Sequence, residues 1–369
     1  MEQPKNKLGK VDFVLFATIM VLVAVGIIMV YSASSYTALH SKAFGYDDMY
    51  FLKKQGISAM IGITFMIIAE KIDYHKWKKY TWILMIITII LLCAVFAFPA
   101  TNGARRWIYL PGGASIQPSE IAKYMVVLYL AKSIEQKGER IKTFTQGILP
   151  YLLVSGFFAG LVLLEKNLSI ATVIMTVTMI ILFTAGVRKK HMTLLSGLVF
   201  LAGVAFTVLE PYRMKRFTSF LNPWEDPRGA GYQLIQSLLA LGSGGVMGMG
   251  LGQSRQKCYY IPEPHNDFIF AIIGEELGLL GCMAVISLFL IFIWRGIRTA
   301  IRAKDIFGTL LAIGITGVVS VQAIINIAVV TGSMPVTGVP LPFISYGGTS
   351  LLFNLMAMGV LLNISRQTN

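Results

Sequence analysis

The chain has 369 residues, of which 55% are hydrophobic and only 14% are charged, and its mean hydropathy is +0.68. A water-soluble globule cannot enclose that much apolar surface, whereas a lipid bilayer requires it. The composition therefore excludes a soluble enzyme and predicts an all-α integral membrane protein, since helices satisfy their own backbone hydrogen bonds in lipid.

Runs of about 17 to 25 mostly apolar residues predict ten transmembrane helices in a single polytopic domain, residues 1–369. We place these helices near residues 11–33, 52–70, 80–98, 119–131, 146–164, 168–185, 191–208, 267–293, 306–331 and 347–364. The first run is longer than the apolar core of a secretory signal, about 7 to 15 residues, so we expect it to remain as a span.

The net charge is +14, and most of the Lys and Arg residues lie in connecting segments that this topology places on one side of the membrane. Lys and Arg favour the cytoplasmic side, so both termini are predicted to be cytoplasmic. The pattern fits contact with anionic membrane lipids and argues against nucleic acid as a partner. Basic residues of the outer loops oppose the rule, so they either reach lipid headgroups or bind an anionic ligand. They are Arg105, Arg106, Arg213, Lys215, Arg216, Arg228, Arg255 and Lys257.

The fourth span carries charged residues, which are costly inside a membrane and are usually paired or functional. Glu120 and Lys123 lie three residues apart and therefore share one helical face, just after Gln117, Pro118 and Ser119. Either Gln117 or Ser119 suits the cap of this helix, and proline suits its first turn. The charged pair is either a structural ion pair or the lining of a polar cavity in which Lys123 meets an anionic headgroup.

The outer loop at about residues 209–266 is too long for a simple connection, so we expect it to be structured and functional. Its prolines predict successive turns at residues 222–227. Residues 232–241 then predict a short amphipathic helix in the membrane interface. Six glycines follow between residues 242 and 252, and their pattern favours close helix packing and turns over a phosphate-binding backbone.

Asp267 stands where this loop meets the eighth apolar run. A carboxylate there either caps the helix or acts as a general base at the membrane mouth. We expect Glu275 on the same face as Asp267 and two to three turns deeper. Ionisable neighbours that could adjust the pKa of Asp267 favour the general base. They are Arg255, Lys257, Glu263, His265, Glu275 and Glu276.

The last outer loop, residues 332–346, contains three prolines that predict a rigid re-entrant path. Ser345 and Tyr346, with the glycine pair that follows, could line a polar pocket. The alternative is a structural lid. No set of His, Cys and Asp residues in the chain has zinc spacing, and no Ser–His–Asp triad can be argued.

With these segments in view, the chain resembles the SEDS family (shape, elongation, division and sporulation), whose members include FtsW, RodA and SpoVE. The matching stretches cover most of the chain in the family's order and spacing, and the forms of residues 222–227 and 250–257 look nearest to the division and sporulation branch. The stretches are residues 103–108, 116–120, 222–227, 250–254, 262–276 and 335–350.

This resemblance implies ten spans, cytoplasmic termini and polymerisation of lipid II into peptidoglycan glycan strands on the outer face of a bacterial cytoplasmic membrane. The essential acid of the family's Pro-Glu-x-x-x-Asp-Phe motif falls on Asp267. Asn266 stands where the family usually has Thr, and Lys166 stands where it often has Pro, between Glu165 and Asn167. The second departure puts the local geometry in question.

The implied mechanism makes Asp267 the general base that deprotonates an acceptor GlcNAc hydroxyl. That oxygen attacks the anomeric carbon of the donor MurNAc with inversion, and a polyprenyl pyrophosphate leaves. Positive side chains, with a divalent cation (Mg or Mn) as the one cofactor considered, would stabilise the leaving group. The substrate-binding candidates are Arg105, Arg106, Trp107, Gln117, Ser119, Glu120, Lys123, Gln253, Ser254, Arg255, Lys257, His265, Glu276, Ser345 and Tyr346.

The family pairs with a class B penicillin-binding protein, a monofunctional transpeptidase, so the resemblance implies that partner here. A lipid II flippase and a non-catalytic scaffold for cell-wall enzymes are the alternatives. A flippase requires polar groups along a path across the bilayer. In this sequence the central spans are nearly uncharged and polarity gathers at the outer face, which favours an enzyme.

Overall fold

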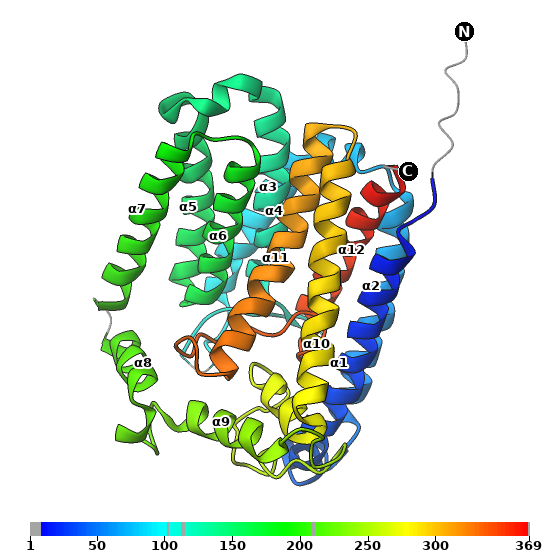
Figure 1. The fold of residues 1–369 in the computed structure, drawn as a ribbon, viewed down its shortest axis with the longest axis vertical. Coiled ribbons are helices and arrows are strands. Elements are labelled where there is room, and N and C mark those ends of the chain that lie inside the picture. Colours follow the sequence, from blue (N-terminus) through cyan, green and yellow to red (C-terminus); the bar gives the residue numbers. More distant parts are fainter. Residues whose placement is uncertain (1–8, 102, 112–114, 209–210, 368–369) are drawn as a thin grey trace.

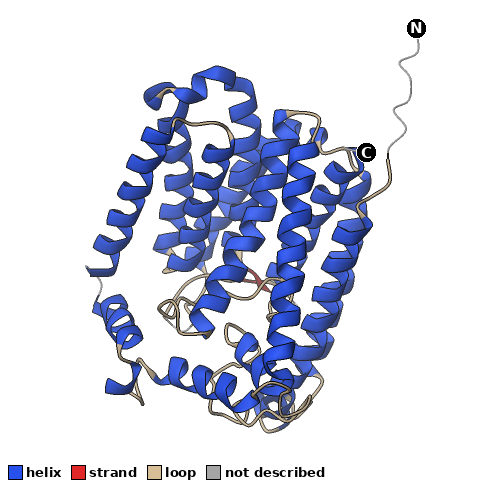
Figure 2. Cartoon of the chain, viewed as in Figure 1, coloured by secondary structure: helices blue, strands red, loops and turns tan. Residues whose placement is uncertain are grey.

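The computed structural model describes residues 9–101, 103–111, 115–208 and 211–367, and most of these are helical (Figures 1 and 2). The long helices are α1 Phe13–Leu39, α2 Tyr50–Lys71, α3 His75–Ala94, α4 Pro118–Lys137, α5 Leu149–Leu164, α6 Leu168–Thr184, α7 Lys189–Val208, α10 Ile269–Arg302, α11 Ile306–Val330 and α12 Gly348–Gln367. The shorter elements are η1 Lys42–Phe44, η2 Val95–Ala97, η3 Gly138–Lys142, η4 Phe144–Ile148, α8 Pro211–Leu221, η5 Pro223–Glu225 and α9 Tyr232–Gly244.

A helix occupies the position of each predicted span. Within the described residues, seven helical stretches are long and apolar enough to cross a membrane, and they contain α1, α2, α3, α5, α10, α11 and α12. Of the other three, α6 is apolar but has only 17 residues, α4 carries charged residues, and α7 has 20 residues. The coarse prediction of an all-α, multi-pass membrane protein is confirmed, apart from one antiparallel pair of two-residue strands, β1 Ile108–Tyr109 and β2 Ser115–Ile116.

The centre of the bundle is formed by α11 and α12. About two thirds or more of each apolar stretch is buried, 67% for α11 and 72% for α12, against 28% for α10. A helix that is apolar on all sides belongs in such a position. α12 packs against α2, and α11 packs against α10, α4 and α6. α1 begins and α12 ends at the same end of the bundle, and α8 and α9 lie at the opposite end (Figure 1).

α10 does not run straight into the membrane as the sequence suggested. Gly278 has φ +66° and ψ −164°, which lie outside the helical range, so the chain turns there. A methyl group on Gly274 would lie 3.2 Å from the Cys282 Sγ. Residues eight apart in a straight helix are separated by about 12 Å along the axis. Residues 269–277 therefore fold back against the rest of α10.

The long outer loop is structured, as predicted. The expected amphipathic helix is present as α9 and is three residues longer, and α8 is a second helix that the sequence analysis did not predict. The Arg213 side chain lies outside the described part. The glycine run serves close packing, because a methyl group on Gly244 would lie 1.9 Å from the Gly274 carbonyl oxygen. This contact brings α9 directly against the folded-back segment of α10.

Candidate active site

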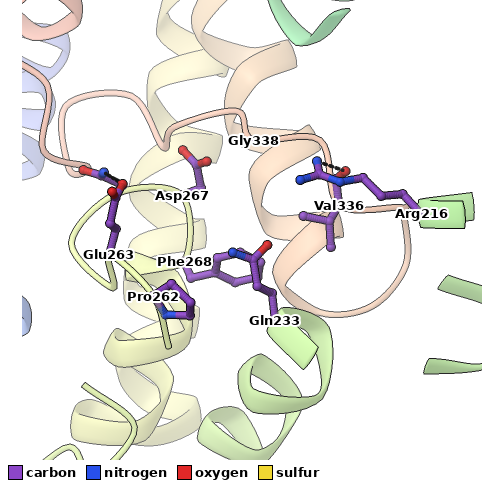
Figure 3. Close-up of a pocket in the computed structure, with 9 residues that line it drawn as sticks. Arg216, Gln233, Pro262, Glu263, Asp267, Phe268, Val336 and Gly338 are labelled. Carbon is purple, nitrogen blue, oxygen red and sulfur yellow. Dashed lines mark hydrogen bonds between the residues drawn. The ribbon is translucent and has the colours of Figure 1, made fainter. Parts of the chain in front are cut away.

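Asp267 lines a cavity of about 260 Å³ at the end of the bundle that carries α8 and α9 (Figure 3). The cavity is built from α8, from α9, from the segment before α10 and from the loop after α11. Its lining residues are Arg216, Gln233, Pro262, Glu263, Asn266, Asp267, Phe268, Val336 and Gly338.

A buried amide fixes the backbone at Asp267. The Asn326 side chain, on α11, donates from Nδ2 to the carbonyl oxygens of Asp267 and Val339, each at 2.7 Å. One amide therefore ties the segment before α10 to the loop that carries Gly338. Figure 3 shows the Asp267 carboxylate pointing toward that loop, and a methyl group on Gly338 would lie 3.2 Å from its Oδ2. Glycine at this position leaves space beside the carboxylate.

Asp267 is not a helix cap. Phe268 occupies the cap position of α10, and no side chain makes a capping hydrogen bond there. The alternative structural role that the sequence allowed is therefore wrong. The carboxylate is held at the cavity wall without serving the helix end.

The surroundings of Asp267 adjust its acidity. Loss of hydration, and to a smaller extent the charge of Glu263, raise the pKa of Asp267 to about 6, even though the charges of Arg106 and Arg216 act to lower it. Arg216 reaches the cavity from α8 and donates to the Val336 carbonyl oxygen at 3.1 Å (Figure 3). A carboxylate with a pKa near 6 is ionised at neutral pH and is still basic enough to accept a proton.

The expectation that Glu275 lies deeper on the Asp267 face is wrong, because α10 begins only at Ile269, so Asp267 lies before the helix and helical spacing does not relate the two residues. Glu275 accepts hydrogen bonds from the Ser254 hydroxyl and from the Arg255 amide, the latter at 3.0 Å. Glu275 and Glu276 are both buried, and neither lines the Asp267 cavity. They anchor the loop before α10.

A second set of contacts completes this arrangement. Lys257 Nζ lies 2.9 Å from Glu276 Oε1, and the Ser32 hydroxyl on α1 donates to Glu276 Oε2 at 2.6 Å. We call Ser32, Ser254, Lys257, Glu275 and Glu276 the fold-back cluster. All of its side chains are buried and hydrogen-bonded to one another or to backbone groups, as structural polar groups in a protein interior are.

The charged pair of α4 is also buried and paired with neighbouring side chains. Lys123 Nζ lies 2.8 Å from Glu120 Oε2 and 2.9 Å from Gln322 Oε1 on α11. Glu120 and Lys123 are each about 1% exposed, and neither lines the cavity. This geometry favours the structural reading, in which the pair joins α4 to α11. Gln117 Nε2 donates to the Ser119 Oγ at 3.1 Å nearby, and neither side chain makes a capping hydrogen bond on α4.

Three further candidates hold the backbone beside Asp267. The Tyr346 amide donates to the His265 carbonyl oxygen at 2.8 Å, and the Ser345 hydroxyl donates to the Asn266 carbonyl oxygen at 2.8 Å. The His265 ring packs on Phe51, with ring centroids 4.2 Å apart. Burial lowers the pKa of His265 to about 4, so the ring is neutral. The loop at 332–346 therefore acts as a structural support over the site.

The remaining candidates separate into near and distant residues. Arg106 is half-buried and acts on Asp267 through its charge. Arg105 is exposed and donates to the Phe96 carbonyl oxygen at 2.9 Å, and Trp107 is half-buried beside it. Gln253 and Arg255 are exposed on the loop that the fold-back cluster anchors, and they do not line the Asp267 cavity.

Several residues that build the site were not predicted from the sequence. Arg216 was recognised only as one of many outer basic residues, and Gln233 only as part of the polar face of a helix. Asn326 carried a usable signal, because an amide inside an apolar span is costly and usually has a partner. Gly338 carried none that distinguishes it from other loop glycines.

The whole chain matches one family. The family profile described as "Cell cycle protein", which covers FtsW, RodA and SpoVE, matches residues 12–369. The chain belongs to the FtsW/RodA/SpoVE family. The resemblance to the SEDS family that the sequence analysis identified is thereby confirmed.

Two relatives illustrate the likeness in sequence. The chain is 44% identical over 358 residues to the "Probable peptidoglycan glycosyltransferase FtsW" of Geobacter sp. (strain M18), which covers 96% of each chain. It is 46% identical over 361 residues to the "Stage V sporulation protein E" of Bacillus subtilis (strain 168), covering 96% of this chain and 97% of that one.

Two solved structures share the fold. One is described as "Structural coordination of polymerization and crosslinking by a peptidoglycan synthase complex"; its TM-score is 0.79 at 27% identity, covering 97% of this chain and 98% of that one. The other is a mutant form of the rod shape determining protein RodA of Thermus thermophilus. Its TM-score is 0.71 at 25% identity, covering 96% of this chain and 97% of that one.

Proposed function

We propose that this member of the FtsW/RodA/SpoVE family is a peptidoglycan glycosyltransferase that polymerises lipid II in cell division or sporulation. The relatives named above supply the reaction class. The observation that carries the proposal for this chain is the state of Asp267, a carboxylate at a cavity wall whose pKa is raised to about 6. Desolvated carboxylates in cavities are typical general bases.

The membrane arrangement follows from the same reading. We infer ten spans in one polytopic domain, with α4, α6 and α7 joining the seven stretches that qualify by length and apolarity. Both termini then lie in the bacterial cytoplasm, and the loop at 209–266 lies outside the cytoplasmic membrane. This orientation places the Asp267 cavity on the outer face, where α8 and α9 would meet the lipid headgroups.

In the proposed mechanism, Asp267 accepts the proton of an acceptor GlcNAc hydroxyl while that oxygen bonds to the anomeric carbon of the donor MurNAc. The bond from that carbon to the polyprenyl pyrophosphate breaks as the new bond forms, so the configuration inverts. The leaving group departs as an anion and needs positive charge more than a proton. Arg106 and Arg216 supply that charge, because both act electrostatically on Asp267.

A requirement for a divalent cation is a prediction, and adding a chelator to the polymerisation assay tests it directly. Within the described residues, no group of three or more His, Cys, Asp or Glu side chains could hold a metal ion. Asp267 and Glu263 are the carboxylates that line the cavity. Asp267 and Glu263 would be the residues to hold a Mg or Mn ion there, and the ion would supply positive charge for the leaving pyrophosphate.

A class B penicillin-binding protein is the partner we propose. The structure described as a peptidoglycan synthase complex, in which polymerisation is coordinated with crosslinking, has the same fold over nearly the whole chain. A transpeptidase beside this chain would crosslink the strands that it makes. Exposed apolar residues on the membrane helices would be available to a partner helix.

The deciding experiment is lipid II polymerisation by purified protein in detergent, with and without the cognate transpeptidase. We expect Asp267→Asn to lower the rate by roughly 10²- to 10⁴-fold, the usual effect of removing a general base. The matched control is Asp47→Asn, which changes a surface carboxylate paired with Lys53 at 2.7 Å. This control should retain the wild-type rate.

The alternatives give different results in the same assay. A flippase would form no polymer in detergent, where no membrane separates two compartments. A scaffold would support cell-wall synthesis in cells with Asp267→Asn as well as with the wild type. Wild-type polymerisation by folded Asp267→Asn protein would rule out Asp267 as the general base.

A further inference from the structure

Glu165 is a buried carboxyl for which the proposed mechanism has no use. It is the cap residue that follows α5, and its side chain is completely inaccessible to solvent. Within the described part of the chain, neither carboxyl oxygen has a hydrogen-bond partner of normal geometry. Such groups are rare in folded proteins because an unpaired buried polar atom is costly. The position of Glu165 therefore requires an explanation.

The surroundings of Glu165 favour its neutral form. Burial outweighs the Arg106 charge and the Ser119 hydroxyl, which both act to lower the pKa of Glu165, and the resulting pKa is about 8. The Ser119 Oγ accepts hydrogen bonds from Gln117 Nε2 at 3.1 Å and from Asn167 Nδ2 at 3.5 Å. Its own proton is then the one it can offer to the carboxyl. At neutral pH most Glu165 side chains are protonated.

Arg106 connects the turn at Glu165 to the Asp267 site. Its Nε donates to the Glu165 carbonyl oxygen at 3.4 Å, and its Nη2 donates to the Lys166 carbonyl oxygen. Lys166 has φ +60°, a left-handed conformation that is unfavourable for a residue with a side chain. The same guanidinium lowers the pKa of both Glu165 and Asp267.

A second path joins the two regions through α6. The Ser169 hydroxyl, in the first turn of α6, donates to the Thr337 carbonyl oxygen. Gly338, the next residue, faces the Asp267 carboxylate. The turn between α5 and α6 is thus adjacent to the wall of the Asp267 cavity, by contacts that do not depend on charge.

We propose that Glu165 is a positioning residue that acts through Arg106 on the Asp267 site, an inference that rests on the proposed glycosyltransferase function. The neutral carboxyl leaves the Arg106 charge directed at Asp267 and at the anionic pyrophosphate of the substrate. The ionised carboxyl forms a charge pair with Arg106 and withdraws that charge. The protonation of Glu165 therefore sets the effective charge of the substrate site.

Other ionisable groups near Glu165 do not substitute for it. Lys166 is exposed and lies beside it in the chain. Glu120 and Lys123, on the helix that carries Ser119, are paired with each other. Glu263 raises the pKa of Asp267, on the other side of the site.

The test is the rate of glycan synthesis as a function of pH for wild type and Glu165→Gln. In the wild type we expect about a tenfold fall between about pH 7 and about pH 9, because the neutral fraction of a group with a pKa of about 8 falls to about a tenth. For Glu165→Gln the rate at about pH 7 and the rate at about pH 9 should agree within about twofold, since glutamine cannot ionise. A wild-type alkaline limb in this variant would overturn the proposal, and so would an equal loss of rate at every pH in folded protein.

Two further variants sharpen this result. Glu225→Gln makes the same change at an exposed carboxylate on the outer face and should keep the wild-type alkaline limb. Ser119→Ala removes the hydroxyl that favours ionised Glu165, so its limb should move to higher pH. If Glu165→Gln does not fold, an unshifted limb in Ser119→Ala is sufficient to reject the proposal.

A measurement without activity separates this inference from the proposed function. Infrared difference spectra of wild type against Glu165→Gln should contain a protonated carboxyl band at about pH 7 that disappears as the pH rises through about 8. Absence of that band refutes the inference, even where the wild type polymerises lipid II. A wild type that shows the band but makes no polymer refutes the function instead.

Discussion

The Asp267 cavity and the fold-back cluster contain carboxylates of the same sequence stretch in opposite physical states. Glu275 and Glu276 are buried, and hydrogen-bond donors of the fold-back cluster and of nearby backbone amides satisfy them. Asp267 lines an open cavity, and its raised pKa reflects lost hydration that its neighbours only partly offset. A satisfied acid stabilises structure, whereas an incompletely stabilised acid remains available for chemistry.

The largest expected contrast is in stability. Glu276→Gln leaves Lys257 as an uncompensated buried charge, and breaking such a pair costs roughly 3–5 kcal/mol. Asp267→Asn should have no such cost. The folded state raises the pKa of Asp267 above its usual value, so ionised Asp267 destabilises the wild type above about pH 6, and the neutral amide removes this penalty.

Thermal unfolding in detergent at about pH 7.5 measures both effects. The midpoint should fall clearly for Glu276→Gln and should stay or rise for Asp267→Asn. Below about pH 4, wild-type Asp267 is protonated, so any gain of the asparagine variant should vanish. A large drop for Asp267→Asn would mean that this acid, too, is structural.

The next contrast is in the acid limb of the rate–pH profile. Below the pKa of about 6, the wild-type rate should fall by about tenfold per pH unit, because the base becomes protonated. Arg216 lowers that pKa, so Arg216→Gln should move the acid limb to higher pH. Lys215→Gln is the matched control, because Lys215 pairs with Asp226 at 3.1 Å and does not line the cavity. Equal profiles for both variants would contradict a role for Arg216 in the site.

The smallest expected effect concerns the space beside the carboxylate. Gly338→Ala strains a residue at φ +74° and adds a methyl group 3.2 Å from the Asp267 Oδ2. We expect the turnover rate to fall about fivefold to tenfold, equivalent to about 1 kcal/mol. Gly332→Ala is the control, because its φ is +70° but its methyl group would make ordinary contacts with Leu234 and Leu238. If both alanine variants lose the same activity, backbone strain explains the loss and crowding does not.

The folded-back segment shows why some of the site could not be predicted from the sequence. Residues 267–293 form one apolar run, and counting along a straight helix places Glu275 on the face of Asp267. α10 begins only at Ile269, so Asp267 lies outside the helix and that count does not apply to it. The turn at Gly278 could not be predicted either, because a single glycine inside an apolar run is also common in straight membrane helices. The packing of α9 against residues 274–276 stabilises the turn, and that contact is not visible in the sequence.

The charged residues on the outer side also make contacts that could not be predicted from the sequence. Glu120 and Lys123 were correctly expected on one face of a helix. The hydrogen bond from Lys123 to Gln322, however, depends on where α11 lies. Arg216 and Asp267 are separated by fifty-one residues, and their approach depends on the path of α8, α9 and the loop after α11. Local spacing predicts neighbours on one element and does not predict which elements meet.

The sequence by itself determined the membrane setting, the helical class and the family, and it predicted the acid that we propose as the general base, because hydropathy and local motifs are properties of short stretches of chain. Only the tertiary structure decided which acids have their hydrogen bonds satisfied and which acid lines a cavity and has a raised pKa. That distinction depends on hydration and on charges brought from distant elements, which exist only when the helices are packed.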